Sequence, residues 1–294
     1  MGAAAKIARA EDRHTRRLSE IAEAIVEANA GRSLKTVLVS GPSSSGKTTF
    51  TGRLCSVLAD KGLSPVPLSI DDFFVNREDT PRDADGQYDF EALEAVDLPL
   101  LNTTLQQLTH GGEVRLPIYD FVSGTRKWQE SPLRLDDNSV IVMEGLHALN
   151  PQLTDLIPEH GKFKIFISCL TAAEAGRGAR ISTFDVRLVR RIARDNAHRG
   201  RTAEQTLEQW ASVRRGEEKY VFPFLGDADT VFDSSLSYEL SALRPLAEPL
   251  LASVGEGSAE RLAADRLTEI VRRFEPIPSD MVPDYSLLRE FVGL

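Results

Sequence analysis

Few residues in this sequence are candidates for disulfide or metal chemistry. The 294 residues include only two cysteines, Cys55 and Cys169, and their spacing fits no metal motif. Cys55 lies in an expected helix and Cys169 at the end of an apolar strand, so we interpret both as buried thiols of a reducing compartment. No hydrophobic run approaches the roughly 18 residues that cross a membrane, and the N-terminus lacks the apolar core of a secretory signal. We therefore expect a cytoplasmic protein with no membrane partner.

Positive charge is also in deficit. The formal net charge is -9, with 41% hydrophobic and 27% charged residues, whereas a general nucleic-acid binder carries a basic footprint. Nucleic acid is therefore not an expected partner, and any basic site must be local. The sequence has no internal repeat and no low-complexity tract, and its length fits one large α/β domain with an appendage. Assembly into a homo-oligomer is left open.

Residues 41–49, with the sequence GPSSSGKTT, match the phosphate-loop (P-loop) pattern G-x-x-x-x-G-K-[ST]. Such a loop points successive backbone N–H groups at phosphate oxygens, while its lysine reaches the β and γ phosphates and its threonine ligates Mg²⁺. An expected strand at 36–40 and helix at 50–58 flank the loop in the required order, which argues against a merely flexible Gly/Ser turn. The predicted nucleotide-binding residues are Gly41, Ser43, Ser44, Ser45, Gly46, Lys47, Thr48 and Thr49.

Apolar runs at 65–70, 140–143, 163–168 and 230–232 predict four further strands, separated by helical or irregular segments. Strands joined by crossovers imply a five-stranded parallel sheet flanked by helices, an α/β fold. We expect a helical lead-in at 1–35 with a surface helix at 13–30, a P-loop domain at 36–250, and a C-terminal helical extension at 251–294 with a helix at 260–274. Residues 112–128, with a turn near Gly124, are typical of a β-hairpin arm.

Acidic residues follow two of these strands. Asp71 and Asp72 end the second strand, and Glu144 ends the apolar run at 140–143. Ligands of parallel sheets bind beyond the carboxyl ends of the strands, so these acids share an edge with the P-loop. An aspartate there accepts a proton from an attacking hydroxyl or holds Mg²⁺, and Glu144 is placed to meet the metal directly or through water. The alternative for one of the two aspartates is a helix N-cap.

Residues 187–201, RLVRRIARDNAHRGR, concentrate arginine on one helix face. Arg187, Arg191, Arg194 and His198 fall on one side, while Leu188, Val189 and Ile192 fall on another. We interpret residues 185–202 as a helical arginine lid that closes over the nucleotide and neutralises charge on the transferred phosphoryl group. A solvated basic face and an RNA-binding patch are the alternatives, but no aromatic residues interleave to stack bases.

Together these segments resemble the phosphoribulokinase/uridine kinase family, most closely its uridine kinase branch. The resemblance extends over residues 36–250 and rests on GPSSSGKTTF, SIDDFF, GQYDFEALEAVD, LPIYDFVSGTR, VIVMEGLHAL and RRIARDNAHRGR. A subgroup of similar kinases follows a threonyl-tRNA-synthetase-like region, and here the sequence starts near the kinase. In this family histidine stands where the chain has Gly124, and the aspartate for the ribose hydroxyls corresponds to Glu91.

The resemblance implies roles for individual residues. Asp71 is the expected general base for the 5′-hydroxyl, assisted by Lys47 and Arg194, with Thr48, Glu144 and Asp71 at the metal. Arg191 and Arg199 are expected at the nucleotide phosphates. The expected acceptor site comprises Asp71, Asp72, Phe74, Tyr88, Glu91, Tyr119, Phe121, Arg194, Arg201 and Gln209.

The sequence therefore predicts transfer of a phosphoryl group from ATP, or alternatively GTP, to a ribonucleoside 5′-hydroxyl in the presence of Mg²⁺, with uridine or cytidine as the first acceptor. A second interpretation is a kinase for another hydroxylated acceptor, such as a pentose phosphate, pantothenate or glycerate. A slowly hydrolysing nucleotide switch is the third, but guanine-specific switches generally carry an N-K-x-D segment, and none occurs.

Overall fold

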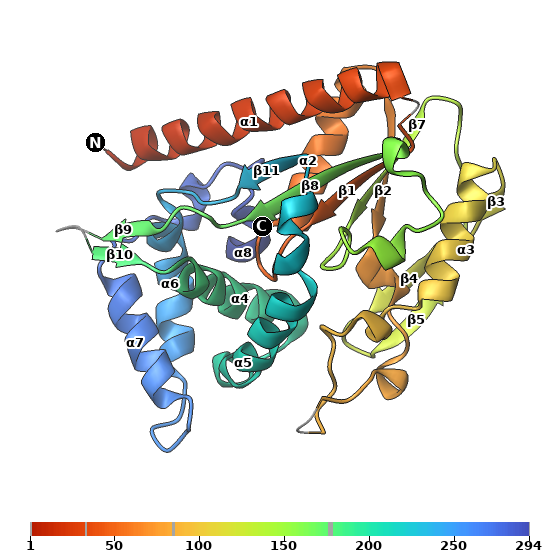
Figure 1. Ribbon diagram of the computed structural model, residues 1–294. Helices are drawn as coiled ribbons and strands as arrows, with labels where there is room; N and C mark the ends of the chain where they lie inside the picture. Colours follow the sequence, from red (N-terminus) through yellow and green to blue (C-terminus); the bar gives the residue numbers. More distant parts are fainter. Residues whose placement is uncertain (1, 33, 84–85, 176–178, 294) are drawn as a thin grey trace.

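The computed structural model describes residues 2–32, 34–83, 86–175 and 179–293 (Figure 1). Its centre is a five-stranded sheet in the order β11-β8-β1-β7-β2, and every neighbouring pair in it is parallel. The expected α/β sheet and its strand positions are thus confirmed. The strands are β1 (Thr36–Ser40), β2 (Ser64–Ser69), β7 (Ser139–Glu144), β8 (Lys162–Ser168) and β11 (Thr230–Asp233).

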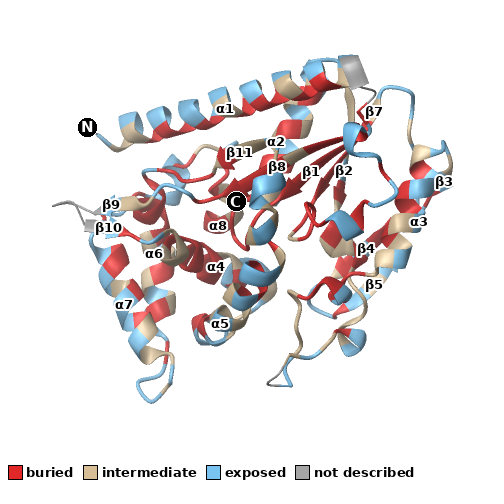
Figure 2. Cartoon of the chain, in the orientation of Figure 1, coloured by how far each residue is buried: buried red, intermediate tan, exposed pale blue. Residues whose placement is uncertain are grey.

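Both faces of the sheet are buried, as Figure 2 shows by the red strands at its centre. Successive residues of a strand point to opposite faces, and they divide here between two hydrophobic clusters. Val37 and Val39 pack toward the helices α1, α2, α4 and α6, whereas Leu38 packs toward α3 on the other face. This burial on both sides explains why β1 and β7 are nearly continuous apolar runs.

Eight α-helices are found in the described residues. The first begins ten residues before the expected start of a helix at 13–30, because Ile7 and Ala10 continue the buried stripe of Leu18, Ile21 and Ile25. The helices are α1 (Ala3–Arg32), α2 (Lys47–Asp60), α3 (Leu98–Thr109), α4 (Thr183–Arg199), α5 (Ala203–Tyr220), α6 (Glu239–Ala252), α7 (Arg261–Arg272) and α8 (Arg289–Val292).

The expected hairpin arm is present beside the sheet. Strand β4 (Pro117–Asp120) pairs antiparallel with β5 (Thr125–Trp128), and Gly124 occupies the turn with φ 72°. A side chain is strained at this φ, so glycine suits the turn. Two further antiparallel pairs are short, β3 (Glu113–Val114) with β6 (Leu133–Arg134) and β9 (Ala173–Ala175) with β10 (Ala179–Ile181).

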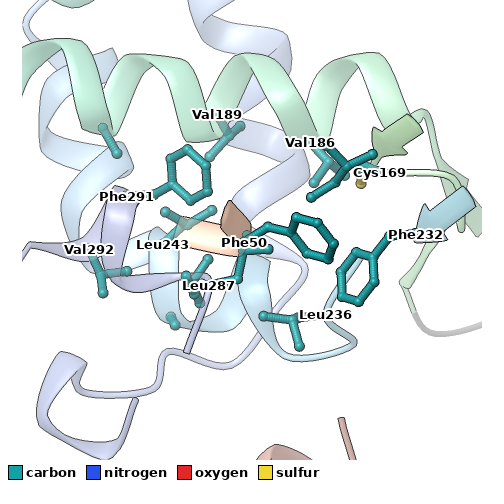
Figure 3. Packing of buried hydrophobic residues seen from close by; sticks show 14 of the residues in the cluster. Phe50, Cys169, Val186, Val189, Phe232, Leu236, Leu243, Leu287, Phe291 and Val292 are labelled. Atoms are coloured by element: carbon teal, nitrogen blue, oxygen red, sulfur yellow. The ribbon is translucent and has the colours of Figure 1, made fainter. Parts of the chain in front are cut away.

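The C-terminal segment shares the core of the P-loop domain. Phe291 of α8 lies beneath α4, Leu287 lies near Phe50 of α2, and the Phe50 ring contacts Phe232 of β11 (Figure 3). Phe291 and Leu287 are each 1% exposed. Residues near the end of the sequence therefore reach the helix that follows the P-loop.

Candidate active site

The P-loop connects β1 to α2, and its backbone requires glycine at two points. A Cβ on Gly41 would lie 1.9 Å from the carbonyl oxygen of Ile167, and Gly46 has φ 91° with the Leu287 side chain 2.2 Å from its Cβ position. Inside the loop the hydroxyls of Ser44 and Ser45 are buried and have no hydrogen-bond partner in the described residues. Buried polar groups normally have a partner, so the loop is built to receive one.

Lys47 begins α2 and folds back over the loop. Its Nζ donates to the carbonyl oxygens of Gly41 at 2.9 Å and Pro42 at 3.2 Å. These are neutral acceptors, and a phosphate oxygen is a stronger partner for an ammonium group. The lysine is therefore positioned at the loop before any nucleotide binds.

Glu144 lies at the end of β7, buried between the P-loop and β2. Its carboxylate accepts hydrogen bonds from the hydroxyls of Thr48 and Ser69, both at 3.1 Å, and no ion pair to it is found within the described ranges. Burial raises the pKa of Glu144 to about 7, and the charge of Asp71 adds to the rise while Lys47 opposes it. A buried carboxylate beside a threonine hydroxyl, without a cation, fits the oxygen ligands of Mg²⁺. Thr48 and Glu144, with Asp71 nearby, are the residues that would hold it.

The two aspartates after β2 lie in a short 3-10 turn, η1 (Ile70–Phe73), and face different ways. Asp71 lines the main cavity together with Lys47. Asp72 does not line it, because its carboxylate accepts the backbone N–H of Tyr119 at 3.1 Å. Burial raises the pKa of Asp72. Asp72 therefore holds the arm against β2, which differs from the substrate contact expected from the sequence.

A cavity of about 500 Å³ opens between the P-loop, the arm and helices α4 and α5. It brings together most of the residues expected at the site: Ser43, Lys47, Asp71, Phe74, Tyr88, Glu91, Tyr119, Phe121, Arg191, Arg194, Arg199, Arg201 and Gln209. Gly41, Ser44, Ser45, Gly46, Thr48, Thr49, Asp72 and Glu144 do not line it. The hydroxyl of Thr49 instead donates to Glu290 of α8 at 3.2 Å.

The end of the cavity at the arm is aromatic. The rings of Phe74, Tyr119 and Phe121 meet edge to face, with centroids 5.2 to 6.2 Å apart. Arg199 places its guanidinium 4.8 Å from the centroid of Phe121. Such a box suits a flat ring whose face contacts aromatic side chains. The same cavity therefore contains Lys47, which suits a phosphate, and an aromatic box, which suits a ring.

Glu91 also lines this cavity. Burial raises its pKa to about 7, while Arg191 opposes the rise and Glu217 adds to it. Glu91 also sits against the helix α5, since a Cβ on Gly216 would lie 2.4 Å from the Cβ of Glu91. A carboxylate at this place can accept a hydrogen bond from a ligand hydroxyl.

The arginines of α4 are held by a buried acid. Asp195 is 0% exposed and pairs with Arg194 at 2.8 Å, Arg191 at 3.3 Å and Arg199 at 3.8 Å. These charges lower the pKa of Asp195 against the effect of burial. Arg191 also donates to the Ser43 hydroxyl at 2.6 Å, and Arg201 donates to Gln209. Arg191 is therefore fixed against the P-loop, and Asp195 holds Arg194 and Arg199 on the same side of α4.

The helix is less open than the sequence suggested. Arg187, which the helical pattern puts in the row facing the nucleotide, is 1% exposed and forms a two-point ion pair with Glu217 of α5 at 2.6 and 2.7 Å. Arg187 and Arg190 donate to the carbonyl oxygens of Ser43 and Ser44. The lid interpretation is thus left for Arg191, Arg194 and Arg199. Arg187 and Arg190 instead support the P-loop through its backbone carbonyl oxygens.

Several residues of the site were not expected from the sequence. Asp195 had a signal, because its spacing of four from Arg191 and Arg199 puts all three on one helix face. Glu217, Arg77 and His147 had none. His147 lines the cavity, its two ring nitrogens have no hydrogen-bond partner in the described part of the chain, and burial lowers its pKa to about 4.

Comparison with known proteins decides the family. The model of the phosphoribulokinase / uridine kinase family matches residues 36–240, well over half of the chain. The chain belongs to this family. As a member it is a P-loop kinase, a phosphotransferase that acts on an alcohol group.

Individual relatives agree with this placement. The chain is 32% identical to the uridine kinase of Deinococcus deserti over 194 residues, which are 66% of this chain and 84% of that protein. It is 31% identical to uridine-cytidine kinase 2-B of Danio rerio over 204 residues, covering 66% of this chain and 70% of the relative. The uridine kinase of Saccharomyces cerevisiae is longer, and the match, 29% identical, covers only 36% of it.

A solved structure shares the fold. The structure of a possible uridine kinase from Bacillus stearothermophilus superimposes with a TM-score of 0.52 at 20% identity, covering 74% of this chain and 98% of that one. At this identity the likeness concerns the fold alone. None of the described helices is both long and apolar enough to span a membrane.

Proposed function

We propose that the chain transfers the γ-phosphoryl group of ATP to the 5′-hydroxyl of a ribonucleoside, with uridine or cytidine as the first acceptor. The observation that carries the proposal is one cavity that is lined both by Lys47 and Asp71 and by an aromatic box. A nucleoside has the matching polarity, a primary hydroxyl at one end and a flat ring at the other. The names of the Deinococcus and Danio relatives support the same acceptor class.

Each residue has a defined part in this proposal. Asp71 accepts the proton of the attacking hydroxyl, and Lys47 moves from its carbonyl partners to the γ-phosphate. Arg194, held by Asp195, neutralises charge that develops on the transferred group. Mg²⁺, when bound at Thr48 and Glu144, neutralises the donor phosphates. A cytoplasmic location remains a prediction that fits this substrate class.

A second acceptor class is favoured by the charge of the cavity. Arg77, Arg191, Arg194, Arg199 and Arg201 line it together with the acids Asp71, Asp83, Glu91 and Glu208, so basic side chains outnumber acidic ones in the lining. A hydroxylated acceptor that bears a carboxylate or phosphate would pair with one of them. Pentose phosphates, glycerate and pantothenate are acceptors of this kind.

One panel separates these alternatives. The purified protein is assayed for ADP or GDP release with ATP or GTP and each of uridine, cytidine, adenosine, guanosine, ribulose 5-phosphate, glycerate and pantothenate. We expect the highest kcat/KM with ATP and a pyrimidine nucleoside. Release that is highest with an anionic acceptor contradicts the nucleoside assignment and supports the second class.

Two matched variants test the roles of the acids. Asp71→Asn is expected to lower kcat by about 10²–10⁴, the scale of a lost general base, with little change in ATP binding. Asp72→Asn is expected to lower it much less, because Asp72 contacts the arm backbone. A larger loss in Asp72→Asn than in Asp71→Asn shows that the base has been assigned to the wrong neighbour.

A further inference from the structure

Arg77 fills the space next to the turn of the arm. A Cβ on Gly124 would lie 2.7 Å from Nε and 2.8 Å from Cζ of Arg77. The backbone N–H of Arg77 donates to the carbonyl oxygen of Gly124 at 2.9 Å. The Arg77 guanidinium group can therefore lie at this turn because residue 124 has no side chain.

The guanidinium group has hydrogen-bonding capacity left over. Its Nη2 donates to the carbonyl oxygen of Phe121 at 2.6 Å and its Nη1 to that of Val122 at 3.5 Å. A guanidinium carries five N–H donors and no acceptor, and these two bonds use two of them. Arg77 lines the cavity at its aromatic end, so remaining donors are available to a ligand there.

A second polar group at this end also lacks a partner. The hydroxyl of Tyr119 is buried without a hydrogen bond in the described residues, and Tyr119 is 6% exposed and lines the same cavity. Burial raises the pKa of Tyr119, and the charge of Arg77 opposes that rise. A buried hydroxyl without a partner, on a residue that lines a cavity, indicates a place where a polar ligand atom can supply the missing hydrogen bond.

We propose that Arg77 selects acceptors that present a carbonyl oxygen rather than an amino group at the ring edge facing the arm. This inference rests on the proposed nucleoside kinase function. With the 5′-hydroxyl at Asp71, position 4 of a pyrimidine points away from the ribose and toward the arm, because it lies opposite the glycosidic nitrogen. Uridine has a carbonyl oxygen at this position and cytidine an amino group.

The selectivity follows from the donor inventory. The carbonyl oxygen of uridine accepts from the guanidinium, whereas the amino group of cytidine is itself a donor and leaves those N–H groups unpaired. A site built for one hydrogen-bonding pattern discriminates strongly against its opposite, since unpaired polar groups in a buried site are costly. We therefore expect uridine to exceed cytidine in kcat/KM by about ten- to a hundredfold.

Arg77 also holds the arm in place through its hydrogen bonds to the two carbonyl oxygens. The test must therefore separate this structural role from the selection of the acceptor. Three acceptors that differ only at position 4 are used: uridine, cytidine and pyrimidin-2-one riboside, which has hydrogen there. The variant Arg77→Gln presents an amide that turns to donate or accept. The control variant is Lys127→Gln, in the hairpin that Arg77 contacts. The Lys127 side chain is 68% exposed, and the residue does not line the cavity.

Wild-type protein is expected to prefer uridine, then pyrimidin-2-one riboside, then cytidine. Arg77→Gln is expected to bring the uridine to cytidine ratio of kcat/KM to within about threefold of unity, with an unchanged KM for ATP, while Lys127→Gln keeps the wild-type ratio. Equal losses for all three acceptors in Arg77→Gln, or a wild-type protein without preference for uridine, overturn the inference alone. ADP release with none of the nucleosides overturns the proposed function, and the inference with it.

Discussion

Replacing Glu217 by alanine is expected to damage both folding and phosphoryl transfer. The Glu217 carboxylate is 0% exposed and accepts two hydrogen bonds from Arg187 and one, at 2.8 Å, from the backbone N–H of Ser43 in the P-loop. Without it the guanidinium keeps the Ser43 carbonyl oxygen at 3.0 Å and the rings of Phe184 and Trp210, each 5.5 Å away. A buried positive charge is then left without its counterion.

The expected loss in the free energy of unfolding is large. Removing one partner of a buried ion pair typically costs about 3–5 kcal/mol, because the other charge stays desolvated and uncompensated. The hydrogen bond from the Ser43 N–H is lost as well. Hydrogen bonds to charged groups contribute about 1.5–3 kcal/mol, and we include this loss in the cost of breaking the pair. Folded domains are stable by only about 5–15 kcal/mol. A loss of at least about 3 kcal/mol is therefore easily measured.

Urea denaturation and ADP release together separate the two effects. The double variant Arg187→Met/Glu217→Leu removes both charges at similar side-chain volume and is expected to regain most of the stability. It leaves the Ser43 backbone without its hydrogen bonds to these two side chains, so kcat is expected to stay low. Glu218→Ala, at an exposed neighbour that pairs with Arg214 on the surface, should change stability by about 0.5 kcal/mol or less. A Glu217→Ala protein within about 1 kcal/mol of wild type, or a double variant with wild-type kcat, refutes the reasoning.

Two other perturbations follow from the geometry. Gly124→His is expected to depress kcat/KM for every acceptor alike, because φ is 72° and the new Cβ would meet Arg77; a changed ratio among nucleosides without general loss contradicts this. Burial lowers the pKa of His14 from 6.5 to about 4, which corresponds to about 3 kcal/mol of stability present above pH 6.5 and lost as the pH falls toward 4. His14→Gln, which keeps a donor for the Ser235 carbonyl, should reduce this pH dependence in urea titrations, whereas the exposed-site control His110→Gln should not.

The sheet and the P-loop were predictable because their signals are local. Each strand of the sheet is an apolar run bounded by turns, and residues 41–49 spell a pattern whose spacing is dictated by phosphate geometry. The rule that ligands bind beyond the carboxyl ends of parallel strands then placed Asp71 and Glu144 at one edge without coordinates. The buried Glu144 beside Thr48 is consistent with that placement.

Contacts between distant segments were not predictable in the same way. The P-loop threonine Thr49 bonds to Glu290, 241 residues away, and Ser43 bonds to Glu217, 174 residues away. Neither acid belongs to a motif, and a charged residue in a helix is usually solvated. The burial of Arg187 escaped prediction for the same reason, since helical periodicity assigns a side chain to a face but does not identify what covers that face.

The acceptor pocket shows why a single position is a poor guide to specificity. Glycine at residue 124, taken alone, suggests an empty space and a missing hydrogen-bond donor. In the structure that space contains Arg77, which reaches it from a segment 47 residues earlier and supplies a donor of a different kind. A donor-only guanidinium and a histidine ring differ in what they accept as a partner. The identity of the acceptor therefore depends on the pair formed by residues 77 and 124. The residues that bind the phosphates give no information about it.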